Sequence, residues 1–201
     1  MIRIAVGAAL LLVLVTATPA AGHPSSCTGW ASRLLPPPRV AVLDPRTGRV
    51  HSVGFRRYVA QVMASGEWPT RLPYQLLRAG ALAVKQFAHY HALRGHWRGG
   101  RSRGRCYDVE GTTRDQLWRP YARPSPKQRR ARDSVWTWSL RKPGGRFFLT
   151  GYRAGTARRC GSDANGWKLY ATSAARCARQ GSSARRIIGR YFGPVHIRTR
   201  T

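Results

Sequence analysis

The residue of this sequence best suited to acid–base chemistry is Glu67. The chain of 201 residues carries 36 lysines and arginines but only 7 acidic residues, and Glu67 is one of two glutamates. It lies between a helix-like run and the pair Trp68-Pro69. A neighbouring indole can exclude water from a carboxyl group and raise its pKa, as a general acid needs, while the many arginines act in the opposite direction. Glu67 is therefore either a proton carrier or an ordinary surface carboxylate.

Other motifs of familiar enzyme classes are absent from the sequence. It contains no GxSxG, no HExxH, no P-loop and no dinucleotide-binding glycine pattern. His89 and His91 are two residues apart, so a helix would project them to different sides, which is poor geometry for a shared metal. We expect each to be a partly buried or surface histidine.

The second chemical feature is the positive charge. The formal net charge is +29, and most of it comes from arginine. Such a field attracts polyanions whatever the fold. Inside a cell the polyanion would be nucleic acid, and outside it would be the cell wall or an acidic glycan. A GC-rich genome, with no partner implied, is the alternative explanation.

The N-terminal segment and the cysteines favour export. Residues 4–15 form an apolar run after Arg3, shorter than the roughly 20 residues of a membrane-spanning helix, and small residues follow at 18–21. We interpret residues 1–22 as a signal peptide and 23–38 as a proline-rich linker; a retained membrane anchor is the alternative. The signal peptide and the paired cysteines disfavour nucleic acid as a partner.

All four cysteines follow that segment, and an even number in an exported chain predicts two disulfides with three conceivable pairings. Proximity in the sequence favours Cys160–Cys177 together with Cys27–Cys106. A zinc site is the rival use of cysteine, but no CxxC or HxxxH spacing is present. We therefore expect no metal.

Hydrophobic patterns predict an α+β fold, with a single domain over residues 39–196. Alternation of apolar residues predicts one β-hairpin at 39–55 and a second at 134–152, the latter with its turn at Gly144-Gly145. Helical spacing predicts a short helix at 55–64, a long central alanine-rich helix at 75–93 packed against the hairpins, and a last helix at 182–191. Residues 120–132 are expected to be a basic, proline-bearing loop.

Several of these segments, in this order, resemble a known family of secreted bacterial cell-wall proteins. It is the stage II sporulation protein D family, also called the amidase-enhancer family. The family pattern is a tyrosine-led helix, a glutamate, a turn containing proline, a second alanine-rich helix, and then a YDV…TT..QVY segment. The matching stretches here are residues 58–62, 67–69, 75–87, 107–109, 112–118, 160–161, 166–170 and 181–191. From end to end the resemblance covers about 150 residues, essentially all of the mature chain.

The resemblance implies an activity and a site. The family includes lytic transglycosylases that cleave the glycan strands of peptidoglycan, and the position of its catalytic glutamate falls on Glu67. One glutamate is enough for that reaction, because the 6-hydroxyl of the substrate replaces water and closes a 1,6-anhydro ring. The substrate contacts that the resemblance places are Trp68, Lys85, Asp108, Gln116 and Tyr152.

Three departures from the family pattern support an alternative. Gly80 and Lys85 stand where the family usually carries Gln and Arg, and the glycine-rich segment of many members is reduced to residues 157–161. Where some members bind zinc, this chain has Glu110, Arg114 and Asp115, so the resemblance implies neither zinc nor a cofactor. The alternative is a non-catalytic module that binds wall glycan and stimulates a cell-wall amidase. Under either hypothesis the expected partners are peptidoglycan and the anionic cell wall, and a monomer suffices.

Overall fold

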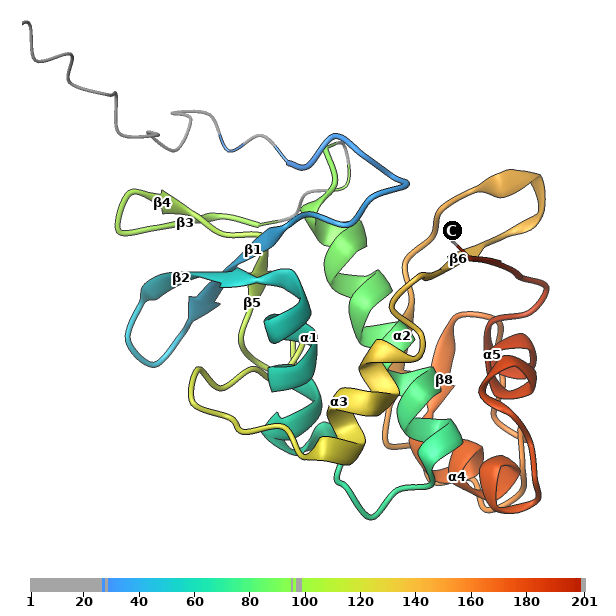
Figure 1. Ribbon diagram of the computed structural model, residues 1–201. Coiled ribbons are helices and arrows are strands. Elements are labelled where there is room, and N and C mark those ends of the chain that lie inside the picture. The colour runs from blue at the N-terminus through green and yellow to red at the C-terminus, as the bar shows by residue number, and fades with distance from the viewer. Residues whose placement is uncertain (1–26, 28, 95, 97–98, 200–201) are drawn as a thin grey trace, which may run out of the picture.

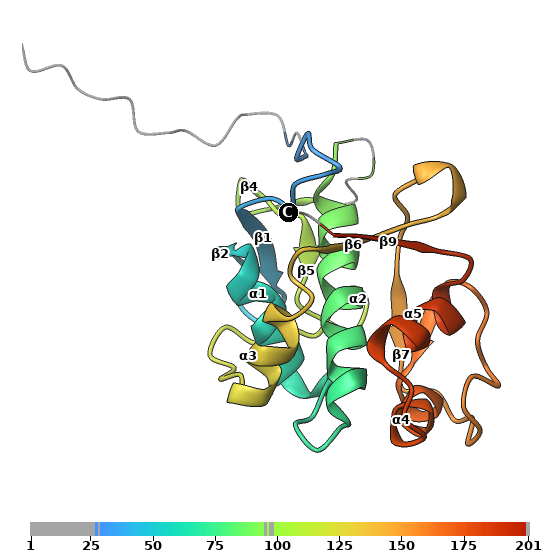
Figure 2. The same ribbon diagram turned by 45° about the vertical axis from the view of Figure 1, so that its right-hand side comes forward.

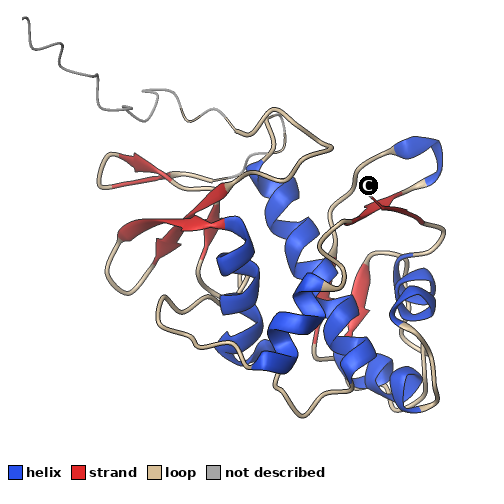
Figure 3. Ribbon diagram, in the orientation of Figure 1, coloured by secondary structure: helices blue, strands red, loops and turns tan. Residues whose placement is uncertain are grey.

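A computed structural model describes residues 27, 29–94, 96 and 99–199, and it mixes helices with several small sheets (Figures 1 and 3). The expected α+β class is confirmed. The helices are α1 (Phe55–Val62), the π-helix η1 (Met63–Glu67), α2 (Tyr74–Ala92), α3 (Pro126–Asp133), the 3₁₀-helix η2 (Pro143–Gly145), α4 (Ala171–Arg179) and α5 (Ala184–Phe192). The strands are β1 (Arg39–Asp44), β2 (Arg49–Gly54), β3 (Arg101–Ser102), β4 (Arg105–Cys106), β5 (Val109–Glu110), β6 (Trp138–Arg141), β7 (Gly151–Arg153), β8 (Lys168–Tyr170) and β9 (His196–Thr199).

The first hairpin forms as predicted. β1 and β2 pair antiparallel from Arg39↔Gly54 to Asp44↔Arg49, and β5 adds to β1 in parallel. Val40 and Val42 point into the core, as the alternation of the sequence requires. The Asp44 carboxylate accepts the backbone N–H of Arg46 at 3.1 Å and so stabilises the turn.

Helix α2 runs between the two halves of the fold (Figures 1 and 2). One side of it meets α1, α3 and β5, and another side meets α4, α5 and β7. Its small residues Ala79, Ala81, Ala83 and Ala88 are all buried, which allows these neighbours to approach closely. The predicted helix at 75–93 therefore forms, and it begins and ends one residue earlier than predicted.

The second predicted hairpin, at residues 134–152, is wrong. β6 pairs with the C-terminal strand β9, β7 pairs in parallel with β8, and the two arms share one bridge, Arg141↔Phe147. The reason is the side chain of Gln86 on α2, which lies between the arms. Its amide donates to the carbonyls of Leu140 (3.0 Å) and Phe148 (3.1 Å) and accepts the N–H of Leu140 (2.8 Å). These bonds replace those that a hairpin would form.

The basic segment at 120–132 is also not wholly a loop, since α3 begins within it. Ser125 caps this helix and forms a reciprocal capping box with Gln128. Pro126 occupies the first turn. The last predicted helix forms as α5, with Ser183 as its cap. Helix α4, which was not predicted, precedes it.

Both expected disulfides are confirmed. Cys27 is bonded to Cys106, and Cys160 to Cys177. The predicted signal peptide at 1–22 lies outside the described residues, as does the first part of the linker. None of the helices in the described part of the chain is long and apolar enough to cross a membrane.

Candidate functional site

Glu67 is placed by the end of the first helical segment. Helix α1 continues into the π-helical turn η1, whose last residue is Glu67. Single π-helical turns are frequent at functional sites because the extra residue redirects the side chains that follow. Inside this turn, Gly66 has a φ of 121°, which suits glycine and few other residues. The local backbone is therefore built to aim Glu67 and Trp68 in different directions.

A chain of buried and partly buried hydrogen bonds leads to the Glu67 carboxylate. Tyr152 on β7 donates its hydroxyl to Oε2 of Glu67 at 2.6 Å. Behind it, the Gln116 amide donates to Tyr152 Oη at 3.4 Å and accepts the hydroxyl of Tyr58 at 2.9 Å. Gln116 is fully buried, and its amide also donates to the Val84 carbonyl of α2 at 3.3 Å. Residues from four separate segments thus orient one carboxylate.

Trp68 forms the wall behind this chain. Its indole is 1% exposed and lies edge-on to Tyr152, with ring centroids 5.2 Å apart. A Cβ atom at Gly80 would lie 2.5 Å from this indole, so α2 must carry glycine where Trp68 packs against it. The glycine at position 80 therefore has a steric explanation, because the indole occupies the space that a larger side chain would need.

The surroundings raise the pKa of Glu67 above its ordinary value. Burial is the largest cause, since it disfavours the charged form. The hydrogen bonds from Tyr152 and from the Leu117 backbone, and the charge of Arg153, act in the opposite direction without cancelling it. Burial and the Glu67 charge also raise the pKa of Tyr152 well above 10.0, so Tyr152 remains a hydrogen-bond donor.

Glu67 opens into a pocket of about 320 Å³. The pocket is lined by Glu67, Phe87, Thr113, Arg114, Asp115, Leu149, Gly151, Tyr152, Arg153, Trp167 and Lys168. Trp167 is 50% exposed, and its indole lies against Phe148 and under the ammonium of Lys142, 4.8 Å from the ring centroid. The pocket therefore combines a protonatable carboxyl group with an open aromatic face and several cations.

Only some of the predicted substrate contacts lie at the Glu67 pocket. Of these residues, Tyr152 lines the pocket with Glu67, whereas Trp68 and Gln116 are buried behind it. Lys85 lies elsewhere, with its ammonium buried against the carbonyls of Val135, Trp136 and Trp138. Lys85 therefore fastens α2 to the segment before β6 and does not face the pocket.

Asp108 also lies outside the pocket lining. Its carboxylate accepts the backbone N–H of Ala41 at 2.8 Å, and the Asp108 N–H donates to the Ala41 carbonyl at 2.8 Å. These bonds tie the start of β5 to β1. The tyrosine-aspartate-valine motif is thereby positioned by the first hairpin, and its aspartate stabilises the sheet.

Apart from Glu67 and Tyr152, the residues that line the pocket were not among the predicted contacts, and they include Asp115, Arg153 and Trp167, whose side chains are suited to binding or acid–base chemistry. Asp115 lies in the threonine-rich motif and accepts the Glu110 N–H at 2.8 Å, and that motif was a usable signal. Trp167 lies in the matching stretch 166–170 but was not singled out there, and Arg153 lies in no matching stretch. They reach the pocket through the parallel pairing of β7 with β8, which no local pattern predicts.

These features define a protein of the α+β class in which a half-buried glutamate lies in a pocket lined by cationic and aromatic side chains. Among the described residues, no cluster of three or more His, Cys, Asp and Glu side chains that could hold a metal ion is found. No protein-family model matches the chain, and no curated protein matches it either. The resemblance to the amidase-enhancer family therefore rests on the sequence motifs alone.

Proposed function

We propose that this chain is an exported peptidoglycan-acting protein, a lytic transglycosylase that cleaves glycan strands with Glu67 as its acid and base. The observation that carries the proposal is a half-buried carboxyl group of raised pKa, held by Tyr152 and open to a pocket. In this proposal residues 39–196 form one domain. Two disulfides fit an oxidising compartment such as the cell exterior.

The reaction needs one proton carrier used twice. Protonated Glu67 donates its proton to the glycosidic oxygen while the bond from that oxygen to C1 breaks, and the electron pair stays on the oxygen. The resulting carboxylate then removes the proton of the 6-hydroxyl. At the same time the oxygen of that hydroxyl attacks C1 and closes the 1,6-anhydro ring. A pKa raised by burial keeps more of Glu67 protonated for the first step.

The neighbours of Glu67 have roles in the same scheme. Tyr152 Oη and the Leu117 N–H stabilise the carboxylate once the proton has left. Trp167 offers an exposed indole on which the apolar face of a sugar ring can lie. Arg114, Arg153 and Lys168 supply donors for glycan hydroxyl and carboxylate groups.

A binding module of the same fold is the second candidate. The observation in its favour is that Glu67 closes a hydrogen-bonded chain through Tyr152, Gln116 and Tyr58, a position that also suits a purely structural carboxylate. In that case the pocket binds glycan without cleaving it, and a cell-wall amidase is the partner.

The test is the Glu67→Gln variant. The amide is nearly isosteric and keeps the contact with Tyr152, so the fold and the glycan affinity should persist. Turnover should fall by at least about 10²–10⁴-fold, because an amide cannot donate the required proton. Mass spectrometry of digested glycan strands detects the 1,6-anhydro ends.

The matched control is Asp115→Asn, which changes a second carboxylate lining the same pocket. It should retain turnover within about tenfold if Glu67 acts alone. Anhydro products from Glu67→Gln at the wild-type rate would rule Glu67 out as the catalyst. Tight binding without products from any of the proteins, wild type included, would select the binding module.

A further inference from the structure

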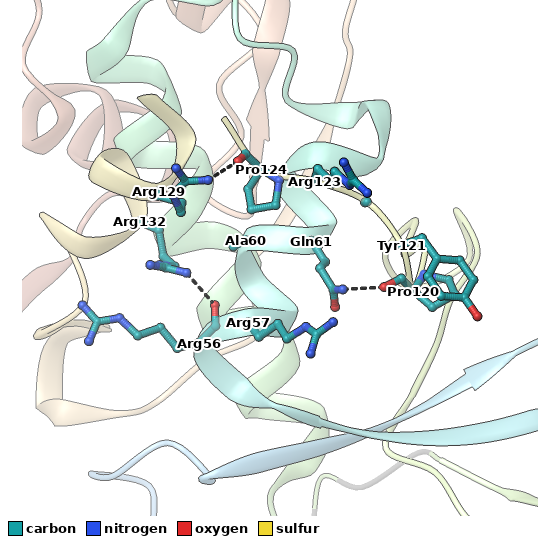
Figure 4. A pocket seen from close by; sticks show the side chains of 11 residues that line it. Arg56, Arg57, Ala60, Gln61, Pro120, Tyr121, Arg123, Pro124, Arg129 and Arg132 are labelled. Carbon is teal, nitrogen blue, oxygen red and sulfur yellow. Dashed lines mark hydrogen bonds between the residues drawn. The ribbon is translucent and has the colours of Figure 1, made fainter. Parts of the chain in front are cut away.

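A second and larger pocket lies on the other side of α1 from the core. Its volume is about 730 Å³, and its lining contains five arginines: Arg56, Arg57, Arg123, Arg129 and Arg132 (Figure 4). The remaining lining residues are Ala60, Gln61, Pro120, Tyr121, Ala122 and Pro124. No carboxylate of the described residues lines it, so the pocket is strongly positive.

Local partners account for three of these arginines. Arg56 and Arg132 share the carboxylate of Asp133, at 2.8 and 2.7 Å, and Arg132 also donates to the Arg56 carbonyl at 3.1 Å. Arg129 donates to the carbonyl of Pro124. The guanidinium groups of Arg132 and Arg56 lower the pKa of the Asp133 carboxyl group, so Asp133 is a carboxylate, but one negative charge cannot neutralise five arginines.

Arg57 and Arg123 are different. Within the described part of the chain, neither guanidinium group has a hydrogen-bond or ion-pair partner, and both side chains are exposed. Unpaired like charges held around one concavity repel each other, so the folded state keeps them at a cost that an anion would remove. The planar fork of arginine matches the oxygens of a phosphate group in particular.

The rest of the lining offers an apolar surface beside the arginines. Tyr121 is 90% exposed, the most exposed of the large hydrophobic side chains described, and it stands beside two prolines and two alanines. A ligand with alternating anionic and carbon-rich units would use both kinds of surface. A chain of phosphodiester-linked alditol or sugar units has this alternation.

The pocket is also rigidly joined to the Glu67 site. The segment that lines it at residues 120–124 is joined through residues 116–119 to residues 113–115, which line the other pocket. Gln61 holds this segment through the Pro120 carbonyl (2.6 Å) and the Trp118 indole (3.0 Å), and Ser65 accepts the Arg119 N–H (3.0 Å). A polymer bound at the arginines would thus contact the same chain segment that leads to the Glu67 pocket.

We infer that the arginine pocket is a binding site for a phosphodiester polymer of the cell wall, built from alditol or sugar phosphates. The choice of a wall polymer rests on the proposed function, whereas the anion site itself does not. The site would keep the protein on phosphate-bearing wall while Glu67 meets the glycan.

The test measures binding of a synthetic glycerol phosphate oligomer that carries a fluorescent end group. The double variant Arg57→Gln/Arg123→Gln removes the two unpaired charges without breaking any described contact. At about 0.1 M salt its affinity should fall at least about tenfold. The slope of log K against log salt should lose about 1.4, which is two contacts at the single-strand value.

The matched control is Arg176→Gln/Arg179→Gln, at two exposed arginines of α4 outside the pocket. It removes the same net charge and should change the affinity by no more than about threefold. Equal losses from both double variants would overturn the site and leave only the general field of the protein. Tyr121→Ala should weaken binding while Tyr121→Phe should not, and equal effects would remove the aromatic contact from the proposal.

Two competing polyanions identify the ligand class. Single-stranded DNA with the same number of phosphates should bind more weakly than the glycerol phosphate oligomer, and tighter binding of DNA would overturn the choice of a wall polymer. Polyglutamate of equal charge should bind more weakly still, and equal binding would overturn phosphate recognition. Glu67→Gln should bind the oligomer as the wild type does, so loss of catalysis and loss of this site are separate results.

Discussion

At the scale of single residues, Glu67 is under two opposing influences. Burial raises its pKa, and the hydrogen bond from Tyr152 lowers it. Because the pKa in the folded state lies above the ordinary value of 4.5, folding favours the neutral carboxyl group. This contribution to stability is fully present below pH 4.5 and is lost as the pH rises through the raised pKa of the folded state. A general acid benefits from the same shift.

Replacing Tyr152 by phenylalanine separates these influences. Tyr152→Phe removes a hydrogen bond to the carboxylate, so the pKa of Glu67 should rise further and the alkaline limb of the kcat/KM profile should move to higher pH. Loss of a bond to a charged group, worth about 1.5–3 kcal/mol, should lower turnover by about 10–100-fold. Because the chain has two glutamates, selective ¹³C labelling lets NMR follow the Glu67 titration directly.

The control for this variant is Tyr74→Phe, at a partly exposed tyrosine at the start of α2. It should leave both the Glu67 titration and the pH profile unchanged. An unshifted Glu67 pKa in Tyr152→Phe would show that the hydrogen bond does not act on the proton carrier.

At the scale of elements, the junction between η1 and α2 determines where the site lies. Trp68 packs on α2 at Gly80 and on Tyr152 of β7, so a single indole connects three segments. The contact between Trp68 and α2 is possible because Gly80 has no side chain. It ties the π-helical turn that carries Glu67 to the longest helix of the fold.

Gly80→Ala should therefore destabilise the protein, although alanine favours helices by about 1 kcal/mol over glycine. The added Cβ, 2.5 Å from the indole, forces Trp68 to move, and overpacking of this kind costs about 1–3 kcal/mol. Denaturant unfolding measures the change in the free energy of unfolding. The control is Gly189→Ala in α5, where nothing lies within 4 Å of the new Cβ, and it should stabilise by about 0.5–1 kcal/mol. Stabilisation by both variants would refute the tight contact at Gly80.

At the scale of the whole molecule, the two disulfides constrain different lengths of chain. Cys27–Cys106 spans 79 residues and holds the N-terminal segment against β4, and Cys160–Cys177 spans 17 residues and holds the loop before β8 against α4. The high positive charge adds self-repulsion that these covalent bonds oppose.

Replacing each cysteine pair by alanine should destabilise the protein, and the loss should be larger for the bond that closes the longer loop, because the entropy term grows with the logarithm of loop length. The expected loss is about 3 kcal/mol for Cys160–Cys177 and about 4.5 kcal/mol for Cys27–Cys106, from the entropy of the unfolded chain. Chemical denaturation of the two double variants checks both values, and alkylation of the non-reduced wild type should label no cysteine. Four labelled cysteines, or unchanged unfolding midpoints, would contradict this account.

The sequence by itself determined the elements whose causes are local. The hairpin β1–β2 and the helix α2 were predictable because alternation, turn residues and helical spacing act between neighbours in the chain. The identity of Glu67 as the candidate acid, and the two disulfide pairings, also came from the sequence. The capping box of Ser125 and Gln128 was a local signal for α3 as well, although the prolines and charges around it predicted a loop.

Only the tertiary structure decided the rest, because it depends on contacts between distant segments. The Gln86 amide of α2 replaces the hydrogen bonds of the expected second hairpin, from more than fifty residues away. Tyr152 and Trp167 reach Glu67 through a parallel strand pair, and no spacing in the sequence encodes that pairing. The sequence predicted Lys85 as a substrate contact, whereas the structure shows it buried against backbone carbonyls. The arginine pocket likewise exists only because α1, α3 and the segment between Trp118 and α3 pack together. The sequence shows many arginines, and only this packing identifies Arg57 and Arg123 as unpaired cations in one pocket.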